Sequence, residues 1–477
     1  MRKKNRTLPL IADLLITDAG AEGMAIAKVD GLVVFVPFAM PGDIVDVQLI
    51  KKRKSYAEGR VVAFKQYASN RQQPMCPHFG VCGGCKWQMM PYEEQLMYKQ
   101  KQVRDNLEHL GQVDTSLMQP ICGSQDIYFY RNKLEYTFSV KEWKQLPPSN
   151  QPIADEGWGA LGFHAPTCFD KVISIEHCAL QQDPSNAIRL SVRDYARNHQ
   201  IPCYDIRNHT GFLRNIIIRC SSLQQWMVIV VVAENRSEWL FPLLDYLKQQ
   251  FPQITSLQYV VNTKYNDTIA DLDVIPYDGM DYIEEVMDGY KGRMPLRFKI
   301  NPKSFYQTNS RQAQRLYSFV ADFAGLTGGE TLYDLYTGTG TIALFLAAMC
   351  GKVVGIEYVE EAVVDARKNA EINGFDNTTF FSGDMAKVLT QAFIEENGRP
   401  DVVVTDPPRA GMHPKVIEQL LAARPSKIVY VSCNPATQAR DLKLLSDSYS
   451  VKRIQPVDMF PHTHHVENVV ELVCKGK

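Results

Sequence analysis

Short apolar runs alternate with amphipathic stretches throughout the last third of the chain. The apolar runs are typical of strands and lie at 331–336, 352–357, 378–384, 401–406 and 427–432, with two more near the C-terminus. The stretches between them carry apolar residues at helical spacing, as in E-A-V-V-D-A-R-K-N-A-E-I-N-G. Strands that alternate with helices in this way form βαβ units. We therefore predict a mostly parallel, doubly wound α/β sheet of the Rossmann-like kind over residues 301–477.

The first 67 residues follow a different pattern, with five short strand-like runs separated by turns that contain Gly or Pro. The runs are L-L-I-T, M-A-I-A-K-V, L-V-V-F-V-P, I-V-D-V-Q-L-I and G-R-V-V-A-F. This arrangement predicts a small OB-like β-barrel over residues 1–67. The segment holds 11 Lys/Arg and 7 Asp/Glu, a balance of +4, and the cluster from Lys51 to Lys54 falls between the fourth and fifth runs. Basic loops of such barrels bind phosphates, so we expect RNA binding here.

Residues 68–300 mix one helical stretch with several strands, and we predict a central α+β domain. A helix is expected over 92–111, with Gly111 as its C-cap. Strand-like runs follow, such as Y-R-N-K-L-E-Y-T-F-S-V and F-L-R-N-I-I-I-R. The stretch 141–159 is rich in Pro, polar residues and Gly, which predicts a long exposed loop or a hairpin insertion.

Composition narrows the class of protein. The chain has 477 residues, enough for about two to four domains, with 45% apolar and 22% charged residues. The basic start M-R-K-K-N-R is not followed by a long apolar run, and no stretch approaches the ~20 apolar residues of a membrane span. We therefore expect a cytoplasmic protein without a membrane partner. The net charge of −1 gives no global sign of a nucleic-acid partner.

Eleven cysteines are present, and most of them are scattered, which argues against a disulfide framework in the cytosol. Cys76, Cys82 and Cys85 are the exception, because the run C-P-H-F-G-V-C-G-G-C places them within ten residues. This spacing predicts a metal centre. On spacing alone, an iron–sulfur cluster and a zinc ion fit four thiolates equally well.

A nucleotide-binding pattern follows the first strand of the predicted α/β sheet. In D-L-Y-T-G-T-G-T, Gly338 and Gly340 allow the backbone to approach a ligand at a helix N-terminus. Glu357, 17 residues after Gly340, ends the second strand and can accept hydrogen bonds from both hydroxyls of a ribose. Asp384, after the third strand, can meet an adenine amino group. The glycines and Glu357 alone fit a NAD-dependent oxidoreductase as well as an S-adenosylmethionine enzyme.

Two further strand ends favour methyl transfer. The fourth strand ends in D-P-P-R, with Asp406, and the fifth ends in S-C-N-P, with Cys433. A lone cysteine is more often a small buried hydrophobe, and hydride transfer would leave both motifs unexplained. A thiolate, by contrast, can add to carbon 6 of uracil and make carbon 5 nucleophilic. A free thiol is mostly protonated at neutral pH, so a donor or positive charge is expected near Cys433, and Arg409 is a candidate.

The reaction also needs a base that removes the proton from carbon 5 after methylation. Glu467, at the start of a late strand, is preferred, because a carboxylate that substrate partly desolvates has a raised pKa. A histidine is the alternative, at His462, His464 or His465. The run H-T-H-H lacks the i, i+4 spacing of a helical metal site.

Together, these motifs resemble the RNA uracil-5-methyltransferase family, which depends on S-adenosylmethionine, and the similarity covers nearly the whole chain. The motifs are F-Y-Q-T-N, D-L-Y-T-G-T-G-T, the acid at Glu357, T-D-P-P-R, V-S-C-N-P-A-T-Q-A-R-D and P-H-T-H-H-V-E-N-V. The resemblance implies that Cys433 is the nucleophile and Glu467 the proton acceptor. It places the remaining cofactor contacts at Gln307, Tyr336, Glu357 and Asp406.

The barrel looks like a TRAM domain, and with the cysteine run it is similar to the branch of the family that acts on 23S ribosomal RNA. That resemblance implies a [4Fe-4S] cluster rather than zinc, with Cys178 of I-E-H-C-A-L as the fourth ligand and Cys168 as its competitor. It implies that the helix near 92–111 packs with the catalytic domain. The expected activity makes 5-methyluridine in 23S ribosomal RNA, by a monomer.

Two alternatives stay open at this point. The transfer-RNA branch of the family typically lacks the barrel and the cysteine run. A non-catalytic RNA-binding or ribosome-assembly factor would be expected to have lost Cys433 or Glu467, and both are present. The 141–159 insertion departs from the family pattern and leaves the target nucleotide open.

Overall fold

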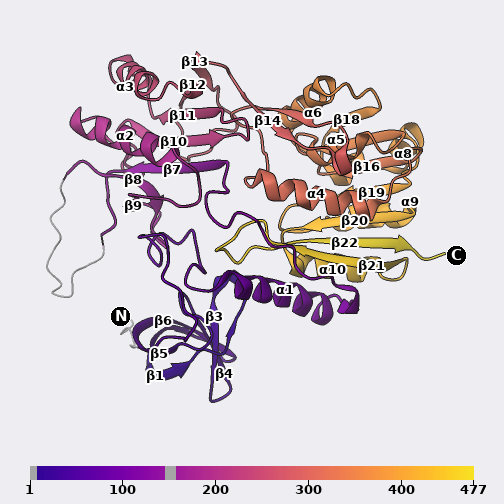
Figure 1. Ribbon diagram of the computed structural model, residues 1–477, viewed down its shortest axis with the longest axis horizontal. Helices are drawn as coiled ribbons and strands as arrows, with labels where there is room; N and C mark the ends of the chain where they lie inside the picture. Colours follow the sequence, from indigo (N-terminus) through magenta and orange to yellow (C-terminus); the bar gives the residue numbers. More distant parts are fainter. Residues whose placement is uncertain (1–7, 145–156, 477) are drawn as a thin grey trace, which may run out of the picture.

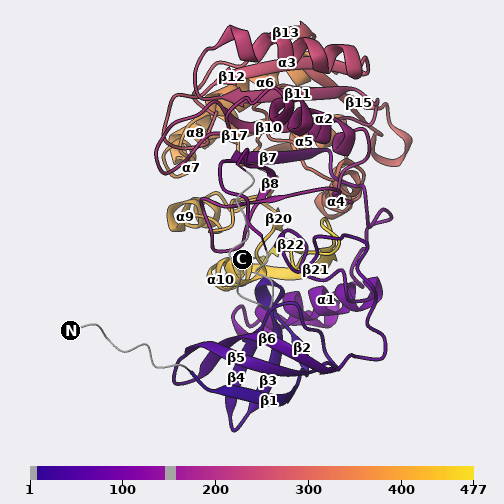
Figure 2. The same cartoon turned by 90° about the vertical axis from the view of Figure 1, so that its left-hand side faces the viewer.

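The computed structural model describes residues 8–144 and 157–476, in which a small barrel and two large sheets are joined by helices (Figure 1). The barrel lies at the lower end of the molecule in Figures 1 and 2, and helix α1 (Tyr92–His109) lies next to it. The two large sheets lie beyond α1. Of the loop expected over 141–159, residues 145–156 lie outside the described residues.

The N-terminal sheet has six strands where the sequence predicts five, in the order β1-β5-β6-β4-β3-β2. The strands are β1 (Leu10–Leu15), β2 (Asp18–Ala19), β3 (Ala25–Val29), β4 (Leu32–Val36), β5 (Ile44–Lys52) and β6 (Tyr56–Gln66). The extra strand is the short β2. The two edge strands are β1, which pairs with β5, and β2, which pairs with β3. They follow each other along the chain, and β1 also contacts β3, so the sheet curls into a barrel.

The basic cluster at Lys51 to Lys54 lies only partly in a loop. Lys51 and Lys52 are the last residues of β5, and only the next residues form the turn to β6. The Lys51 ammonium lies 2.5 Å from the Glu58 carboxylate, so this pair neutralises one charge of the cluster. The turn therefore offers fewer free cations than the sequence suggests.

The central sheet has seven strands in the order β13-β12-β11-β10-β7-β8-β9. They are β7 (Lys133–Ser139), β8 (Ala160–His164), β9 (Val172–Ser174), β10 (Leu213–Cys220), β11 (Trp226–Val232), β12 (Ile254–Val261) and β13 (Ile275–Gly279). Helices α2 (Ser185–Asn198) and α3 (Ser237–Gln250) cover one face (Figure 1). Alternate residues of β10, such as Ile216 and Ile217, enter different core clusters on the two faces, which explains the continuous apolar run in the sequence.

The C-terminal sheet is the doubly wound sheet that the sequence predicts, in the order β18-β17-β16-β19-β20-β22-β21. Its strands are β16 (Thr331–Leu335), β17 (Lys352–Glu357), β18 (Thr378–Ser382), β19 (Val402–Thr405), β20 (Lys427–Ser432), β21 (Tyr449–Val457) and β22 (Glu467–Cys474). The first five are parallel, and β22 is antiparallel to both of its neighbours. The strand order reverses between β16 and β19, and open α/β sheets bind ligands at such a switch point.

Helices connect and cover the C-terminal sheet, and a hairpin precedes it. The helices are α4 (Ser310–Ala324), α5 (Thr341–Ala347), α6 (Glu360–Ile372), α7 (Met385–Val388), α8 (Gln391–Asn397), α9 (Pro414–Ala423) and α10 (Pro435–Leu445). The hairpin consists of β14 (Ile283–Met287) and β15 (Leu296–Ile300). One core cluster contains residues of β10, β11 and β12 together with α4 and the C-terminal sheet. The two large sheets therefore share a hydrophobic core, and the division of the chain at residues 67 and 300 stays a prediction.

Helix α1 packs against α10, and Gly111 lies at this contact. The helix ends at His109 with Leu110 as its C-cap, so Gly111 is not the cap that the sequence predicts. Its φ is not left-handed; instead, a Cβ at Gly111 would come within 2.8 Å of the Leu107 carbonyl and 3.1 Å of the Ala439 carbonyl. Gly111 thus permits a close approach to α10.

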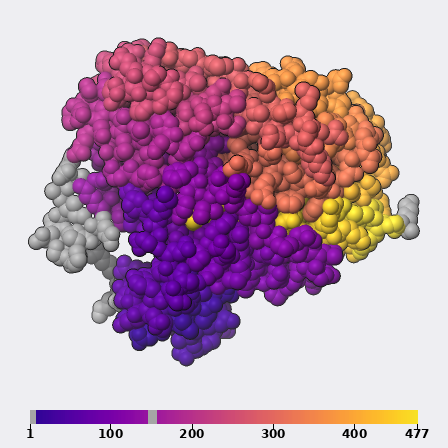
Figure 3. Space-filling view, viewed as in Figure 1, coloured from indigo at the N-terminus to yellow at the C-terminus, as the bar shows by residue number. Residues whose placement is uncertain are grey.

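In Figure 3, the yellow C-terminal segment emerges toward the middle only in small patches between indigo and purple residues.

Candidate active site

The loop after β16 is shaped for a ligand that lies against its backbone. Tyr336 has φ of 65°, a left-handed conformation that is uncommon for a non-glycine residue, and Gly338 and Gly340 have φ of 57° and 81°. A Cβ at Gly338 would meet nothing within 4 Å, whereas one at Gly340 would lie 3.1 Å from the Ala366 Cβ. The space above Gly338 is therefore open, and Gly340 permits close packing on α6.

Glu357 lies at the end of β17, beside this loop. Its carboxylate accepts hydrogen bonds from the amides of Gly338 at 3.0 Å, Tyr358 at 2.8 Å and Val359 at 3.0 Å. These bonds fix the carboxylate between the glycine loop and the start of α6. A carboxylate offers about four acceptor positions, so one remains for a ligand hydroxyl. This geometry leaves room for one ribose hydroxyl, where the sequence suggests that Glu357 accepts from two.

Asp384 follows β18, and Gln307 lies two residues after Phe305, whose carbonyl accepts from the Thr339 hydroxyl of the glycine loop at 3.3 Å. Asp384 caps α7, because its side chain accepts from the Ala386 amide at 3.1 Å, and its carboxylate lies 3.5 Å from the Lys387 ammonium. The cap fixes the Asp384 carboxylate just after β18. Gln307 is half-buried, and its backbone carbonyl accepts from the Asn132 side chain at 2.9 Å.

The segment 301–309, which carries Gln307, is held from the central sheet. The buried guanidinium of Arg219 on β10 donates to the carbonyls of Asn301 at 2.7 Å, Pro302 at 3.1 Å and Ser304 at 2.6 Å. Burial lowers the pKa of Arg219 to about 10. Sequence reasoning missed this anchor, because the partners are more than 80 residues apart and no local pattern connects them.

Two carboxyl groups lie at the switch point of the sheet. Asp334, near the end of β16, is buried, and its Oδ2 accepts from the Thr337 hydroxyl at 2.6 Å. Burial raises the pKa of Asp334 to about 7, against the effect of that hydrogen bond. Burial likewise raises the pKa of Asp406, which follows β19. Sequence reasoning found Asp406 but missed Asp334, although a charged residue inside an otherwise apolar strand was a usable signal.

Cys433 and Glu467 come together at the adjoining ends of two antiparallel strands. In the register of β20 and β22, Ser432 pairs with Asn468, so the next positions place Cys433 opposite Glu467. Glu467 is 7% exposed, and Cys433 is half-buried. The structure thus brings together the thiol and the carboxylate that the sequence separates by 34 residues.

The protonation of this pair is dominated by burial. Burial, together with the charges of Glu467 and Asp406, raises the pKa of Cys433 to about 11, while Arg409 acts in the opposite direction. Burial, followed by the charge of Asp406, raises the pKa of Glu467 well above its ordinary value. Arg409 is therefore the positive charge expected near the thiol, but its effect does not offset burial.

The three histidines before Glu467 lie in one loop. His462 is buried, and its Nδ1 lies 3.2 Å from the Gln95 side-chain amide. His465 lies 3.3 Å from Arg409 and 4.1 Å, between ring centroids, from His464. Burial lowers the pKa of His462 and His464 to about 4 and that of His465 to about 3. They are weak bases at these pKa values, which favours Glu467 as the proton acceptor.

The expected metal site is only partly recognisable. Within residues 8–144 and 157–476, no group of three or more His, Cys, Asp and Glu side chains is arranged to hold a metal ion. Cys76, Cys82, Cys85 and Cys178 are nevertheless close enough for a charge on one to raise the pKa of another. Burial is the larger cause, and it raises the pKa of Cys82 to about 11 and that of Cys85 to about 12.

Comparison with known proteins agrees with the chemistry of these strand ends. A sequence model described as tRNA (Uracil-5-)-methyltransferase matches residues 277–475, and one described as TRAM domain matches residues 11–62. An uncharacterised RNA methyltransferase of Bacteroides thetaiotaomicron is 55% identical over 95% of this chain and 99% of its own length. One from Porphyromonas gingivalis is 53% identical over 96% of this chain and 99% of its own. The chain belongs to the RNA uracil-5-methyltransferase family.

A solved structure in this family shares the whole architecture. The tRNA (uracil-54, C5)-methyltransferase of Pyrococcus abyssi, in complex with S-adenosyl-L-homocysteine, aligns with a TM-score of 0.74 and 28% identity, over 96% of this chain and 99% of its own. The α/β class I methyltransferase fold with an N-terminal TRAM domain is thereby confirmed. Because that enzyme acts on tRNA, the barrel does not by itself separate ribosomal-RNA from transfer-RNA members.

Among the described residues, no helix combines the length and the apolar character that crossing a membrane requires.

Proposed function

We propose that this methyltransferase transfers a methyl group from S-adenosylmethionine to carbon 5 of a uridine in 23S ribosomal RNA. The observation that carries the proposal is the placement of Cys433 opposite Glu467, beside Asp406 and the loop after β16. Nucleophile, proton acceptor and cofactor site thus lie at one edge of one sheet.

The residues of the cofactor site fit S-adenosylmethionine. The open space above Gly338 accommodates a ligand against the backbone, and Glu357 is fixed where a ribose would lie. Asp384 would meet the adenine, with Gln307, Tyr336, Gly340 and Asp406 as the further contacts. S-adenosylmethionine supplies an electrophilic methyl group on its sulfonium.

In the proposed reaction, the Cys433 thiolate adds to carbon 6 of uracil and makes carbon 5 nucleophilic. Carbon 5 would take the methyl group as the S–CH3 bond of the sulfonium breaks and S-adenosylhomocysteine leaves, and the carbon 5 proton then passes to the Glu467 carboxylate. The electron pair of that C–H bond forms the C5–C6 double bond and expels the thiolate, which leaves 5-methyluridine. The raised pKa of Glu467 suits a proton acceptor, provided that the carboxyl is ionised when RNA is bound.

The test uses RNA that contains 5-fluorouridine. Fluorine at carbon 5 cannot leave as a proton does, so the methylated adduct stays attached to the protein. Incubation with labelled S-adenosylmethionine is expected to give a stable protein–RNA adduct that Cys433→Ala abolishes. An adduct that persists in Cys433→Ala would overturn the role of Cys433, and the absence of any methylation in the unsubstituted protein would overturn the proposed function.

Transfer RNA is the second candidate substrate, because the P. abyssi enzyme named for tRNA aligns over 96% of this chain. The cysteine run favours 23S ribosomal RNA by resemblance. Transcripts of both RNA classes, offered separately to the same preparation, decide between them. Methylation of tRNA without methylation of 23S RNA would replace the first assignment by the second.

We further propose that Cys76, Cys82, Cys85 and Cys178 hold a [4Fe-4S] cluster, with zinc as the alternative. Four thiols near one another supply the donor set of either metal centre. No chemical step is assigned to the cluster. Iron and acid-labile sulfide in a brown anaerobic preparation would support it, and zinc without iron would contradict it.

A further inference from the structure

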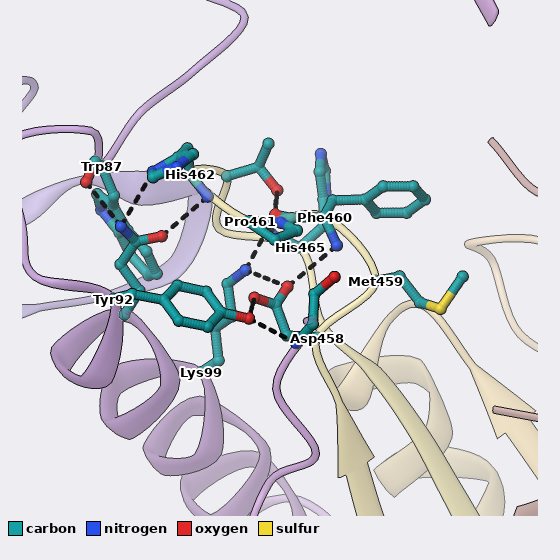
Figure 4. Close-up of polar contacts among 12 residues, drawn as sticks. Trp87, Tyr92, Lys99, Asp458, Met459, Phe460, Pro461, His462 and His465 are labelled. Atoms are coloured by element: carbon teal, nitrogen blue, oxygen red, sulfur yellow. Dashed lines mark hydrogen bonds and ion pairs between the residues drawn. The ribbon is translucent and has the colours of Figure 1, made fainter. Parts of the chain in front are cut away.

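The loop between β21 and β22 leads directly into Glu467. This segment, residues 458–466, is called the 458–466 loop. It contains the three histidines of the site, and Figure 4 shows its first half against helix α1. Glu467 is the first residue of β22, so strand pairing holds its backbone on one side and this loop holds it on the other. The loop therefore contributes to the orientation of the Glu467 side chain and carries the His465 ring.

Most of the anchors of the 458–466 loop come from the N-terminal part of the chain. Its carbonyls at 459, 460, 461 and 462 all accept hydrogen bonds from outside the loop. The donors are the side chains of Asn309, Lys99 and Tyr130, followed by the backbone amides of Lys86 and Trp87. Only Asn309 belongs to the half of the chain that contains the catalytic sheet. The remaining donors come from helix α1, the segment after the cysteine run and the segment before β7.

Lys99 of α1 makes the one charged contact among these anchors. Its ammonium lies 2.6 Å from the Asp458 carboxylate and donates to the Phe460 carbonyl at 3.1 Å. Both side chains of the Lys99–Asp458 pair are 0% exposed. Tyr92, two turns earlier on α1, donates to the other Asp458 oxygen at 2.8 Å (Figure 4). Burying an ion pair costs desolvation energy, so the pair adds little to the stability of the fold. It does hold the two side chains in one geometry.

A second contact fixes the loop in the same position. The Gln95 side chain, also on α1, accepts from the His462 amide at 2.8 Å and contacts the His462 ring at 3.2 Å. Tyr92, Gln95 and Lys99 occupy successive turns of one helix face. Together they hold both ends of the segment from Asp458 to His462.

We propose that Lys99 is a positioning residue for proton removal from carbon 5, because it sets the 458–466 loop and through it the Glu467 carboxylate. The inference rests on the proposed function of Glu467. Helix α1 thereby ties the correct placement of the proton acceptor to the N-terminal half of the protein. Loss of the anchor should slow the last steps of the reaction and leave thiol addition and methyl transfer less affected.

The experiment compares Lys99→Met with Lys101→Met on ordinary RNA, without fluorouridine. Lys101 lies on the same helix, is 44% exposed and pairs with Asp105 and Asp18 at the surface. In Lys99→Met, kcat is expected to fall about 10- to 100-fold with KM for RNA nearly unchanged, since small displacements of a reacting group cost about this much. A methylated protein–RNA adduct should accumulate at the same time, because its elimination waits for the base. Lys101→Met should behave as the unsubstituted protein.

A purely structural role predicts a different result. Lys99→Met would then lower the fraction of active protein, and the remaining molecules would turn over without accumulating adduct; this outcome would overturn the proposal. If the stranded Asp458 charge prevents folding, Lys99→Met/Asp458→Asn and Tyr92→Phe carry the same test with less disruption. Normal turnover of both folded variants without adduct accumulation would likewise overturn it. Failure of the proposed function is a separate outcome, in which the unsubstituted protein does not methylate RNA.

Discussion

Cys433 and Glu467 lie opposite each other, one residue beyond the last paired positions of β20 and β22. A thiol on carbon 6 and a base for the carbon 5 proton must approach adjacent atoms of one uracil ring. Two antiparallel strands that end together supply this arrangement without a mobile segment. The backbone pairing of the sheet therefore places the two residues opposite each other, and the 458–466 loop contributes to the orientation of the Glu467 side chain.

Glu467→Gln is expected to arrest the reaction after methyl transfer. The amide keeps the size of the side chain but cannot accept the proton, so turnover should fall about 10²- to 10⁴-fold. Methylated protein–RNA adduct should accumulate on ordinary RNA, and gel mobility with labelled S-adenosylmethionine measures it. The double variant Cys433→Ala/Glu467→Gln is the control and should form no adduct. Loss of turnover without any adduct in Glu467→Gln would assign this residue an earlier role.

In the protein without RNA, the reactivity of the Cys433 thiol should keep rising as the pH is raised well above 7. Its pKa is raised to about 11 by burial and by the charges of Glu467 and Asp406. Alkylation of the Cys433 peptide by iodoacetamide, followed by mass spectrometry, should therefore accelerate about tenfold per pH unit between pH 7 and pH 10. The unfolded chain at each pH provides the reference. A rate that levels off by pH 8 would contradict the raised pKa.

Substitution of the neighbouring charges separates their effects on this thiol. Asp406→Asn removes a negative charge and should make Cys433 react faster at a given pH. Arg409→Gln removes the cation that lowers the thiol pKa and should make it react more slowly. Equal rates in both variants would mean that burial alone controls the thiol.

The sequence predicted the elements that depend on local pattern. The strands expected at 352–357 and 427–432 are observed as β17 and β20, because each is a buried apolar run bounded by polar residues. Glu357 and Cys433 were located for the same reason, since each ends or follows such a strand. The helix expected over 92–111 is observed as α1, with a shorter C-terminus.

The anchors of the site could not be predicted in this way. Lys99 and Asp458 are 359 residues apart, and nothing in either local pattern marks a fully buried ion pair. In the sequence, Lys99 is one of many polar residues on an amphipathic helix. Only the docking of α1 on the 458–466 loop removes it from water. The pKa of Cys433 was unpredictable for a related reason, because burial in the folded protein outweighs the nearby Arg409.

Asp334 should make the protein less stable as pH rises from about 4 to about 7. Burial raises its pKa from 3.8 to about 7, so the native state retains a proton that the unfolded chain releases. The contribution of Asp334 to the free energy of unfolding is fully present below pH ~4. It is lost as the pH rises to ~7, by up to ~4 kcal/mol. The melting temperature of Asp334→Asn should fall less steeply across this pH range than that of the unsubstituted protein. The exposed substitution Asp376→Asn is the control and should leave the slope unchanged, and an unchanged slope in Asp334→Asn would contradict the assignment.

Arg219→Met is expected to weaken cofactor binding without touching the cofactor. Its guanidinium holds the carbonyls of Asn301, Pro302 and Ser304. Its loss removes the donor of the Pro302 and Ser304 carbonyls, at a cost of about 1–3 kcal/mol for the buried Ser304 carbonyl, while Asn301 keeps the Ser304 amide. The segment 301–309 should relax, and Gln307 with it.

The affinity for S-adenosylhomocysteine, measured by titration calorimetry, should fall about tenfold or more in Arg219→Met, since tenfold corresponds to about 1.4 kcal/mol. Arg297→Met is the matched control, because Arg297 lies on the neighbouring strand β15 with its side chain 63% exposed. It should bind S-adenosylhomocysteine as the unsubstituted protein does. A lowered melting temperature in Arg219→Met with unchanged affinity would show that this arginine supports the fold and not the placement of Gln307.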